Sequence, residues 1–274
     1  MSVYEIITEK ILEQLERGTI PWRKPWSVIP PQNAVSRKPY RGINALLLNS
    51  LAFESPFFIT FKQARDLGGF VRKGERGFPV VFWTFVEKEG EEKRIPLLRY
   101  YTVFNLSQVD GMKAPTVEPR AIRPIDRCEE ILSSMPNPPS IAFGGNRASY
   151  SPAADRIALP CRERFNNIEE FYSTAFHELI HSTGHKKRLS RSGITEDVVS
   201  FGSDSYSREE LVAELGASFL CGNAGIATAT VQNSASYIAS WLSALQNDKR
   251  LIISAAGQAQ KAVDYVLGEG TASE

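Results

Sequence analysis

Apolar side chains recur at helical spacing at the start of the chain. Ile7, Ile11 and Leu15 stand four residues apart. Gly18 follows them, so the pattern predicts an amphipathic helix over residues 2–17. The same signals predict these further elements in the first half: helices over 43–53 and 61–67, a strand or the lead-in to a helix over 57–61, and strands over 78–87 and 96–106.

A proline-rich stretch divides the chain. Residues 113–125, KAPTVEPRAIRPI, hold three prolines, which is typical of a linker. Beyond it the pattern predicts these elements: a helix over 126–134, short strands over 140–159, and helices over 167–183, 207–222, 231–246 and 249–267. We therefore expect an α+β protein with an N-terminal domain over 1–112 and a C-terminal domain over 126–274.

Composition excludes several classes of protein. No apolar run reaches the roughly 18 residues that a membrane span needs. The first eighteen residues carry four glutamates, unlike a secretory signal. Cys128, Cys161 and Cys221 are too few and too scattered for a disulfide framework or a cysteine-based zinc site. We expect a cytoplasmic protein with no membrane partner.

The net charge of +1 hides a basic region. Residues 17–76 hold 11 Lys and Arg against 3 Asp and Glu, a local net charge of +8. An excess of this size indicates either a surface for a polyanion or a solvated basic face.

The three histidines of the chain all lie in the segment HELIHSTGH, residues 177–185. His177 and His181 are four residues apart on a predicted helix, so their imidazoles leave the same face one turn apart. Two nitrogens at that separation suit neighbouring corners of a tetrahedral Zn²⁺ site. Glu178 can then accept a proton from a metal-bound water as general base. Mn²⁺ or Co²⁺ suits the same ligands.

A third protein ligand is expected at a catalytic zinc site. Our prediction is Glu214, because it stands between Ala213 and Leu215 in an apolar stretch where an unpaired carboxylate would be costly.

Two alternatives to Glu214 remain. Glu210 has a local role, because Ser207 and Glu210 fit a capping box at the start of the helix over 207–222. His185 follows Gly184, which is expected to end the preceding helix and turn His185 away.

Other features narrow the class of metal site. Lys187 stands where a metzincin has its third histidine, and no methionine follows the motif, so a gluzincin-type arrangement remains. Asp204 or Tyr206 could stabilise an oxyanion or orient a histidine there.

Aromatic and amide side chains are interleaved with the cations of the basic region. Such a mixture suits sequence-tolerant binding of single-stranded DNA, with rings for bases and cations for phosphates. The alternative is that the tryptophans pack inside the fold. The candidates are Trp22, Arg23, Lys24, Trp26, Arg37, Lys38, Tyr40, Arg41, Asn44, Lys62, Arg72, Lys73, Arg76 and Trp83.

Segments along nearly the whole chain resemble ArdC-type antirestriction proteins, which are encoded on conjugative plasmids. They are PWRKPW, PYRGINALLL, TFKQARDLGGFVRKGERGFPVVFW, YYTVFNLSQVDG, FYSTAFHELIHSTGHKKRLSR, YSREELVAELGASFL and SASYIASWLSALQNDKR. The resemblance implies an N-terminal single-stranded-DNA-binding domain, a C-terminal zincin-like metallopeptidase domain and protection of incoming DNA from host restriction. The family's zinc motif falls on His177, Glu178 and His181, and its ELVAE segment on Glu210 to Glu214.

Three hypotheses about function remain open. The first is a DNA-binding zinc peptidase that cuts a protein target, such as a component of a restriction system. The second is a non-catalytic protein that masks single-stranded DNA and carries a structural or vestigial metal site. The third hypothesis is a housekeeping metallopeptidase with no nucleic-acid role.

Overall fold

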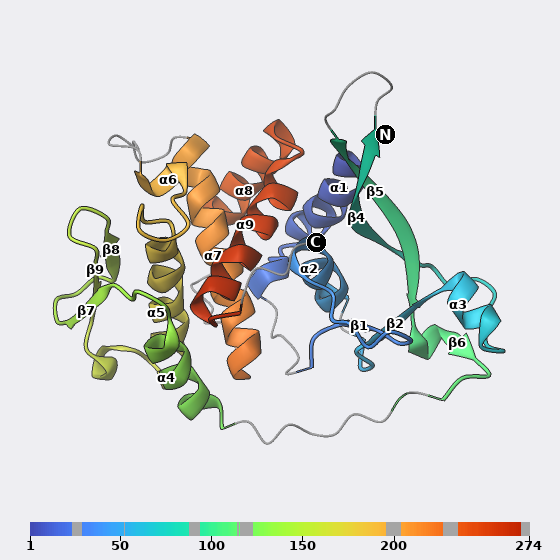
Figure 1. Cartoon of the computed structure of the whole chain (residues 1–274), viewed down its shortest axis with the longest axis horizontal. Coiled ribbons are helices and arrows are strands. Elements are labelled where there is room, and N and C mark those ends of the chain that lie inside the picture. The colour runs from blue at the N-terminus through green and yellow to red at the C-terminus, as the bar shows by residue number, and fades with distance from the viewer. Residues whose placement is uncertain are drawn as a thin grey trace.

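Helices fill the middle of the molecule, with a small sheet at either end (Figure 1). The computed structural model describes residues 1–23, 29–51, 53–87, 94–113, 115, 123–195, 204–226 and 235–269. Its α-helices are α1 (Val3–Glu16), α2 (Gly42–Ser50), α3 (Phe61–Asp66), α4 (Pro124–Ser134), α5 (Ile168–Thr183), α6 (Ser192–Thr195), α7 (Asp204–Ala224), α8 (Ala235–Asn247) and α9 (Leu251–Val266). The short 3-10 helices are η1 (Pro21–Arg23), η2 (Leu106–Gln108) and η3 (Arg162–Arg164).

The strands form three sheets. They are β1 (Gln32–Asn33), β2 (Phe57–Thr60), β3 (Phe70–Val71), β4 (Phe78–Glu87), β5 (Arg94–Asn105), β6 (Val109–Asp110), β7 (Ser140–Phe143), β8 (Ser149–Ser151) and β9 (Arg156–Leu159). The largest sheet has the order β1-β2-β5-β4, the second joins β3 to β6, and the third has the order β7-β9-β8. This architecture confirms the α+β prediction.

Most predicted elements lie within a few residues of the observed ones. The capping box of Ser2 and Glu5 starts α1, which holds Ile7, Ile11 and Leu15 in the core as the spacing predicts. The segment 57–61 is a strand that leads directly into α3. One difference between prediction and structure affects the candidate metal site. Helix α7 begins at Asp204 and not at residue 207. Most of the predicted linker lies outside the described residues.

The longest strands form an antiparallel ribbon at the edge of the four-stranded sheet. β4 pairs with β5 from Phe78 opposite Val103 to Glu87 opposite Arg94. Asn44 of α2 covers the free edge of β4, because its side chain accepts a hydrogen bond from the Val81 N–H and donates one to the Val81 carbonyl, both at 2.7 Å. The edge is thereby protected at this point from pairing with another strand.

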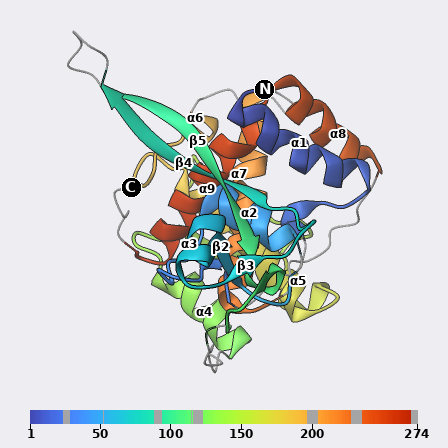
Figure 2. The same cartoon turned by 90° about the vertical axis from the view of Figure 1, so that its right-hand side faces the viewer.

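One hydrophobic cluster runs through both halves of the chain. It joins α1 and α2 to α5, α7 and α9, and its members include Ile11, Leu15, Leu46, Phe176, Leu211, Ile252 and Ala259. In Figure 2, α1 and α8 lie side by side, and they are in contact along their length. The N-terminal helices therefore share the core of the C-terminal half. None of the described helices has the length and apolarity that crossing a membrane requires.

Trp22 fastens the segment after α1 to the C-terminal helices. Its side chain is fully buried, and its indole ring meets that of Trp241 edge-on with ring centroids 5.9 Å apart. The Trp22 carbonyl also accepts a hydrogen bond from the Ser218 hydroxyl on α7. The prediction that Trp22 contacts DNA is therefore wrong, because a base could stack on this ring only if the core opened.

We expect Trp22→Ala to lower the free energy of unfolding by about 3–5 kcal/mol, because it removes a fully buried aromatic side chain. Trp83→Ala is the matched control, since Trp83 is 45% exposed and its loss should cost about 1 kcal/mol or less. Denaturant unfolding followed by circular dichroism measures both. Equal stability of the two variants would contradict this role for Trp22.

Candidate metal centre

Helix α5 carries both candidate histidine ligands. Its N-cap is Asn167, whose side chain accepts a hydrogen bond from the Glu170 N–H at 2.8 Å, as expected for an asparagine at this position. The helix continues to Thr183 and so keeps His177 and His181 on successive turns. Their imidazole rings meet edge-on with centroids 4.7 Å apart.

Helix α7 brings carboxylates to these imidazoles. The two helices approach closely at Gly216, where an added Cβ would come within 2.8 Å of the Ile180 side chain. A larger residue at this position would push α7 away from α5. The close approach sets Glu209 and Glu210, two turns earlier on α7, beside the histidines.

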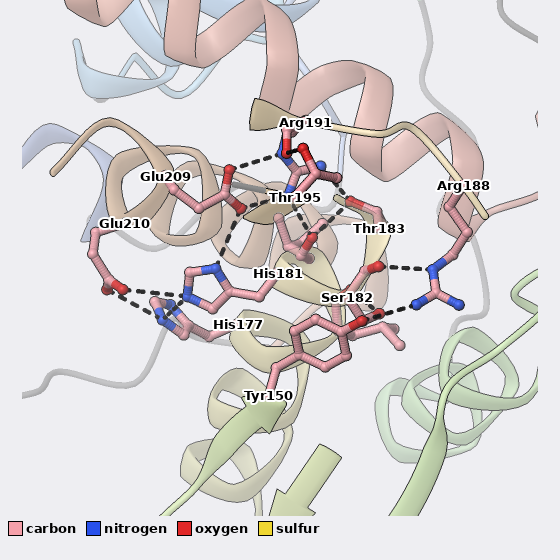
Figure 3. A network of polar contacts seen from close by, with 12 residues as sticks. Tyr150, His177, His181, Ser182, Thr183, Arg188, Arg191, Thr195, Glu209 and Glu210 are labelled. Carbon is pink, nitrogen blue, oxygen red and sulfur yellow. Dashed lines mark hydrogen bonds and ion pairs between the residues drawn. The ribbon is translucent and has the colours of Figure 1, made fainter. Parts of the chain in front are cut away.

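Three side chains direct their donor atoms toward one point (Figure 3). The Nε2 atoms of His177 and His181 are 3.1 Å apart. The Glu210 carboxylate oxygens lie 3.6 Å from the first and 3.5 Å from the second. A tetrahedral ion with bonds of about 2.0–2.1 Å holds its ligand atoms about 3.3 Å apart, so the group fits a divalent metal.

Glu209 orients His181 from the side away from this point. One oxygen of the Glu209 carboxylate lies 3.3 Å from Nδ1 of His181, which leaves Nε2 for the ion. The Arg191 guanidinium holds both Glu209 oxygens, at 2.9 and 2.5 Å. Arg191 also donates to the Thr183 hydroxyl and to the Ile180 carbonyl. A histidine ligand whose other nitrogen faces a fixed carboxylate is the usual arrangement around protein-bound metals.

The charges of this group shift its pKa values in opposite directions. Burial acts to lower the pKa of His181, but Glu209 and Glu210 outweigh it and raise that pKa to about 10. Burial acts to raise the pKa of Glu210, yet hydrogen bonding to His177 and His181 holds it well below its usual range. The carboxylate of Glu209 is likewise kept ionised against its burial, chiefly by Arg191. The two carboxylates thus favour positive charge at His181, which is either its own proton or a metal ion that replaces that proton.

Glu178 lies next to His177 on α5 and is 8% exposed. No hydrogen bond or ion pair joins its carboxylate to another side chain within the described ranges. It is thus available for a group bound at the centre.

The third side chain of the converging group is Glu210 and not the predicted Glu214. Glu214 is half-buried one turn further along α7 and is outside the converging group of described residues. The prediction failed because it made Ser207 the helix cap and gave Glu210 to a capping box. Since α7 begins at Asp204, Ser207 is inside the helix and Glu210 faces the histidines.

The other predicted neighbours do not join the group. Nδ1 of His185 accepts a hydrogen bond from the Lys187 N–H at 3.2 Å and lies 3.8 Å from the Asp155 carboxylate. His185 is therefore turned toward β9 and its neighbours, in line with the expectation that Gly184 ends the helix. The side chains of Asp204 and Tyr206 lie outside the described residues.

Sequence reasoning missed Glu209 and Arg191. A charged pair that is 6% and 8% exposed is rare unless it serves a site. The signal in the sequence was the acidic pair EE at the start of a helix that otherwise becomes apolar, but only the packing of α7 on α5 shows which carboxylate touches which imidazole.

The candidate DNA-binding residues divide into three groups. The first group is exposed: Arg37, Lys38, Lys62, Arg72, Lys73, Arg76 and Trp83. Within it, Arg72 forms ion pairs with Glu75 and Asp110, and Arg37 lies over the Phe57 ring. Lys24, Trp26 and the side chain of Arg23 lie outside the described residues. The last group has structural contacts: Trp22 is in the core, Asn44 binds the β4 backbone, Tyr40 is half-buried, and Arg41 forms an ion pair with Asp264 of α9.

Known families match each half of the chain. The profile of zincin-like metallopeptidases matches residues 127–258, and the profile of the N-terminal domain of the anti-restriction factor ArdC matches residues 1–104. Two crystal structures of the antirestriction protein ArdC from plasmid R388 resemble the whole chain. The metal-free one has 38% identity and a TM-score of 0.79 over 98% of both chains. The Mn(II)-bound one has 36% identity and a TM-score of 0.81 over 100% of both chains.

The chain belongs to the ArdC family of antirestriction proteins. Its C-terminal half has the zincin-like fold that the resemblance implied.

Two further relatives show how this unit occurs in other proteins. The uncharacterized protein y4eC of Sinorhizobium fredii is 35% identical over 97% of this chain and 91% of its own length. The DNA primase TraC of Escherichia coli is 36% identical over 96% of this chain, which spans only 20% of that primase. The sequence of this ArdC-family chain therefore recurs as one part of larger proteins.

We expect Glu210→Gln to lose bound divalent metal and Glu214→Gln to retain it. Glu210 supplies an anionic oxygen to the converging group, whereas Glu214 lies outside it. Metal analysis of the purified variants after dialysis, with Mn²⁺ and Zn²⁺ in turn, measures the difference. Metal loss from Glu214→Gln alone would overturn this assignment of the third ligand.

Glu209→Gln should weaken metal binding by about 10–100-fold, the usual effect of replacing a partner of a histidine ligand. The amide keeps the shape of the side chain but removes the charge that faces His181. Titration calorimetry measures the affinity, and Glu163→Gln on the exposed η3 serves as the control. Unchanged affinity in Glu209→Gln would show that Glu209 does not position His181.

Proposed function

We propose that this chain is a metal-dependent peptidase that binds single-stranded DNA and protects incoming DNA from restriction in the cytoplasm of the recipient. The observation that supports the peptidase is the convergence of His177, His181 and Glu210 beside Glu178. The printed name of its relative from plasmid R388 supports the antirestriction role.

The proposed ligands are His177, His181 and Glu210. A bound Zn²⁺, Mn²⁺ or Co²⁺ would polarise a peptide carbonyl and lower the pKa of a bound water. Two neutral imidazoles and one carboxylate leave a fourth position for water or substrate.

Glu178 is the proposed general base. It follows His177 directly on α5, so its carboxylate starts from the same turn as a ligand. Its burial excludes bulk water, which favours proton transfer to this carboxylate from a water held at the centre. Glu209 and Arg191 would keep His181 fixed while that proton moves.

The exposed basic residues of the N-terminal half support binding to DNA. Cations on an exposed surface can neutralise phosphates without first breaking a contact in the core. The exposed candidates are Arg37, Lys38, Lys62, Arg72, Lys73 and Arg76, with Trp83 available for stacking. A protein of the restriction system is the proposed substrate, since its cleavage would protect the DNA that this chain binds.

Glu178→Gln should keep its metal and its affinity for single-stranded DNA but lose protection, because the change removes the proton acceptor and no ligand. Protection is measured as the efficiency of plasmid transfer into a restricting host relative to a non-restricting host. Glu163→Gln, an exposed carboxylate on η3, is the matched control.

Full protection by Glu178→Gln would reject the catalytic role. That result would favour the alternative in which the chain masks DNA without cleaving a protein.

A further inference from the structure

The β4–β5 ribbon extends past the helices and carries exposed aromatic side chains (Figure 2). Its base is anchored, since Val81 and Leu98 on one face belong to the central core. The exposed aromatic residues of the ribbon are Phe82 at 41%, Trp83 at 45%, Phe85 at 56%, Tyr100 at 47% and Tyr101 at 38%. So many partly exposed rings on one projecting ribbon are unusual for a surface without a partner.

Two of these rings, Phe82 and Tyr101, share one face of the ribbon with Arg99. Phe82 stands directly opposite Arg99, and Val80 stands opposite Tyr101, so Phe82 and Tyr101 are diagonal neighbours. Their ring centroids are 5.6 Å apart with an angle of 55° between the planes. We call Phe82, Arg99 and Tyr101 the ribbon face.

The ribbon face itself carries one charge, the Arg99 cation, whereas residues 87–94, which join β4 to β5, hold four Glu against three Lys and Arg. Residues 78–85 of β4 and 96–105 of β5 contain no aspartate or glutamate, and Arg99 is their one cation. Tyr40 packs against the cluster that contains Val80, and Val80 stands opposite Tyr101. Tyr40 leads back to Lys38, which is exposed. Rings and cations thus continue from the ribbon into the basic region.

We propose that the ribbon face is where the bases of single-stranded DNA stack. This inference rests on the proposed DNA-binding function and adds the surface that performs it. Rings accept the faces of any base, and an adjacent guanidinium can contact a phosphate or stack in turn. Phe82, Arg99 and Tyr101 were not among the candidates from the sequence, although Trp83 of β4 was.

The ribbon face fits DNA better than a second copy of the chain. A two-fold contact across so small a face would bring the two Arg99 guanidinium groups near each other with no acid on the face to separate them. Phosphate groups supply the opposite charge.

The test is fluorescence anisotropy with a labelled single-stranded oligonucleotide of mixed sequence at low salt. We expect Phe82→Ala combined with Tyr101→Ala to weaken binding at least about tenfold, since each lost stacking contact has an effect of roughly that size. Arg99→Ala should weaken binding and reduce the dependence on salt by about one phosphate contact. Thermal unfolding checks that the variants stay folded.

The matched control is Phe70→Ala on β3. Phe70 is 61% exposed and stands near the exposed cations Arg72 and Lys73, but it is outside the ribbon. Affinity should change less than about twofold in this variant, well below the effect of one lost stacking contact.

The outcomes separate the two proposals. If the wild-type chain binds no single strand at low salt, the proposed DNA-binding function itself fails. If the wild-type chain binds but the double variant binds as tightly as the wild type, base stacking on the ribbon face is rejected while DNA binding stands. The same conclusion follows if Phe70→Ala weakens binding as much as the double variant does.

Discussion

The buried ion pair between Arg191 and Glu209 is the contact on which the candidate metal centre depends. Burying two charges is costly unless each is paired and hydrogen-bonded. Here Arg191 reaches Glu209 on α7 as well as Thr183 and the Ile180 carbonyl on α5. One guanidinium therefore ties the end of α5 to the start of α7, and Glu209 transmits this fixed position to His181. The orientation of His181 is thus set by side chains of the protein itself.

The same helix α7 connects the metal centre to the first half of the chain. Glu209 and Glu210 are in its first half, and Ser218, two turns further on, donates to the Trp22 carbonyl. Helices α1 and α2 complete the hydrophobic cluster that α7 and α9 begin. The profile of the N-terminal domain ends at residue 104, and the profile of zincin-like metallopeptidases begins at residue 127. Packing nevertheless joins the two halves through one core. The proposed surface for DNA on the N-terminal half is thus held in a defined place relative to the proposed peptidase centre.

Aromatic residues of the N-terminal half occupy two different environments. Trp22 is buried against Trp241, whereas Trp83, Phe82 and Tyr101 remain on the projecting ribbon. Both environments suit aromatic rings, so composition alone could not separate a core tryptophan from a stacking one. The distinction depends on whether helices from elsewhere in the chain cover that stretch. They cover one face of the ribbon at Val81 and Leu98 and leave Phe82 and Tyr101, on the other face, exposed.

The sequence by itself determined what local chemistry controls. Apolar spacing, caps and prolines placed most helices and strands, and the i, i+4 spacing put His177 and His181 on successive turns of α5, because those relations are fixed within one helix. The tertiary structure alone decided that Glu210 and not Glu214 meets the imidazoles, that Arg191 and Glu209 support His181, and that Trp22 is buried. These outcomes depend on the start of α7, its rotation and its close approach at Gly216, which come from packing between segments far apart in the chain.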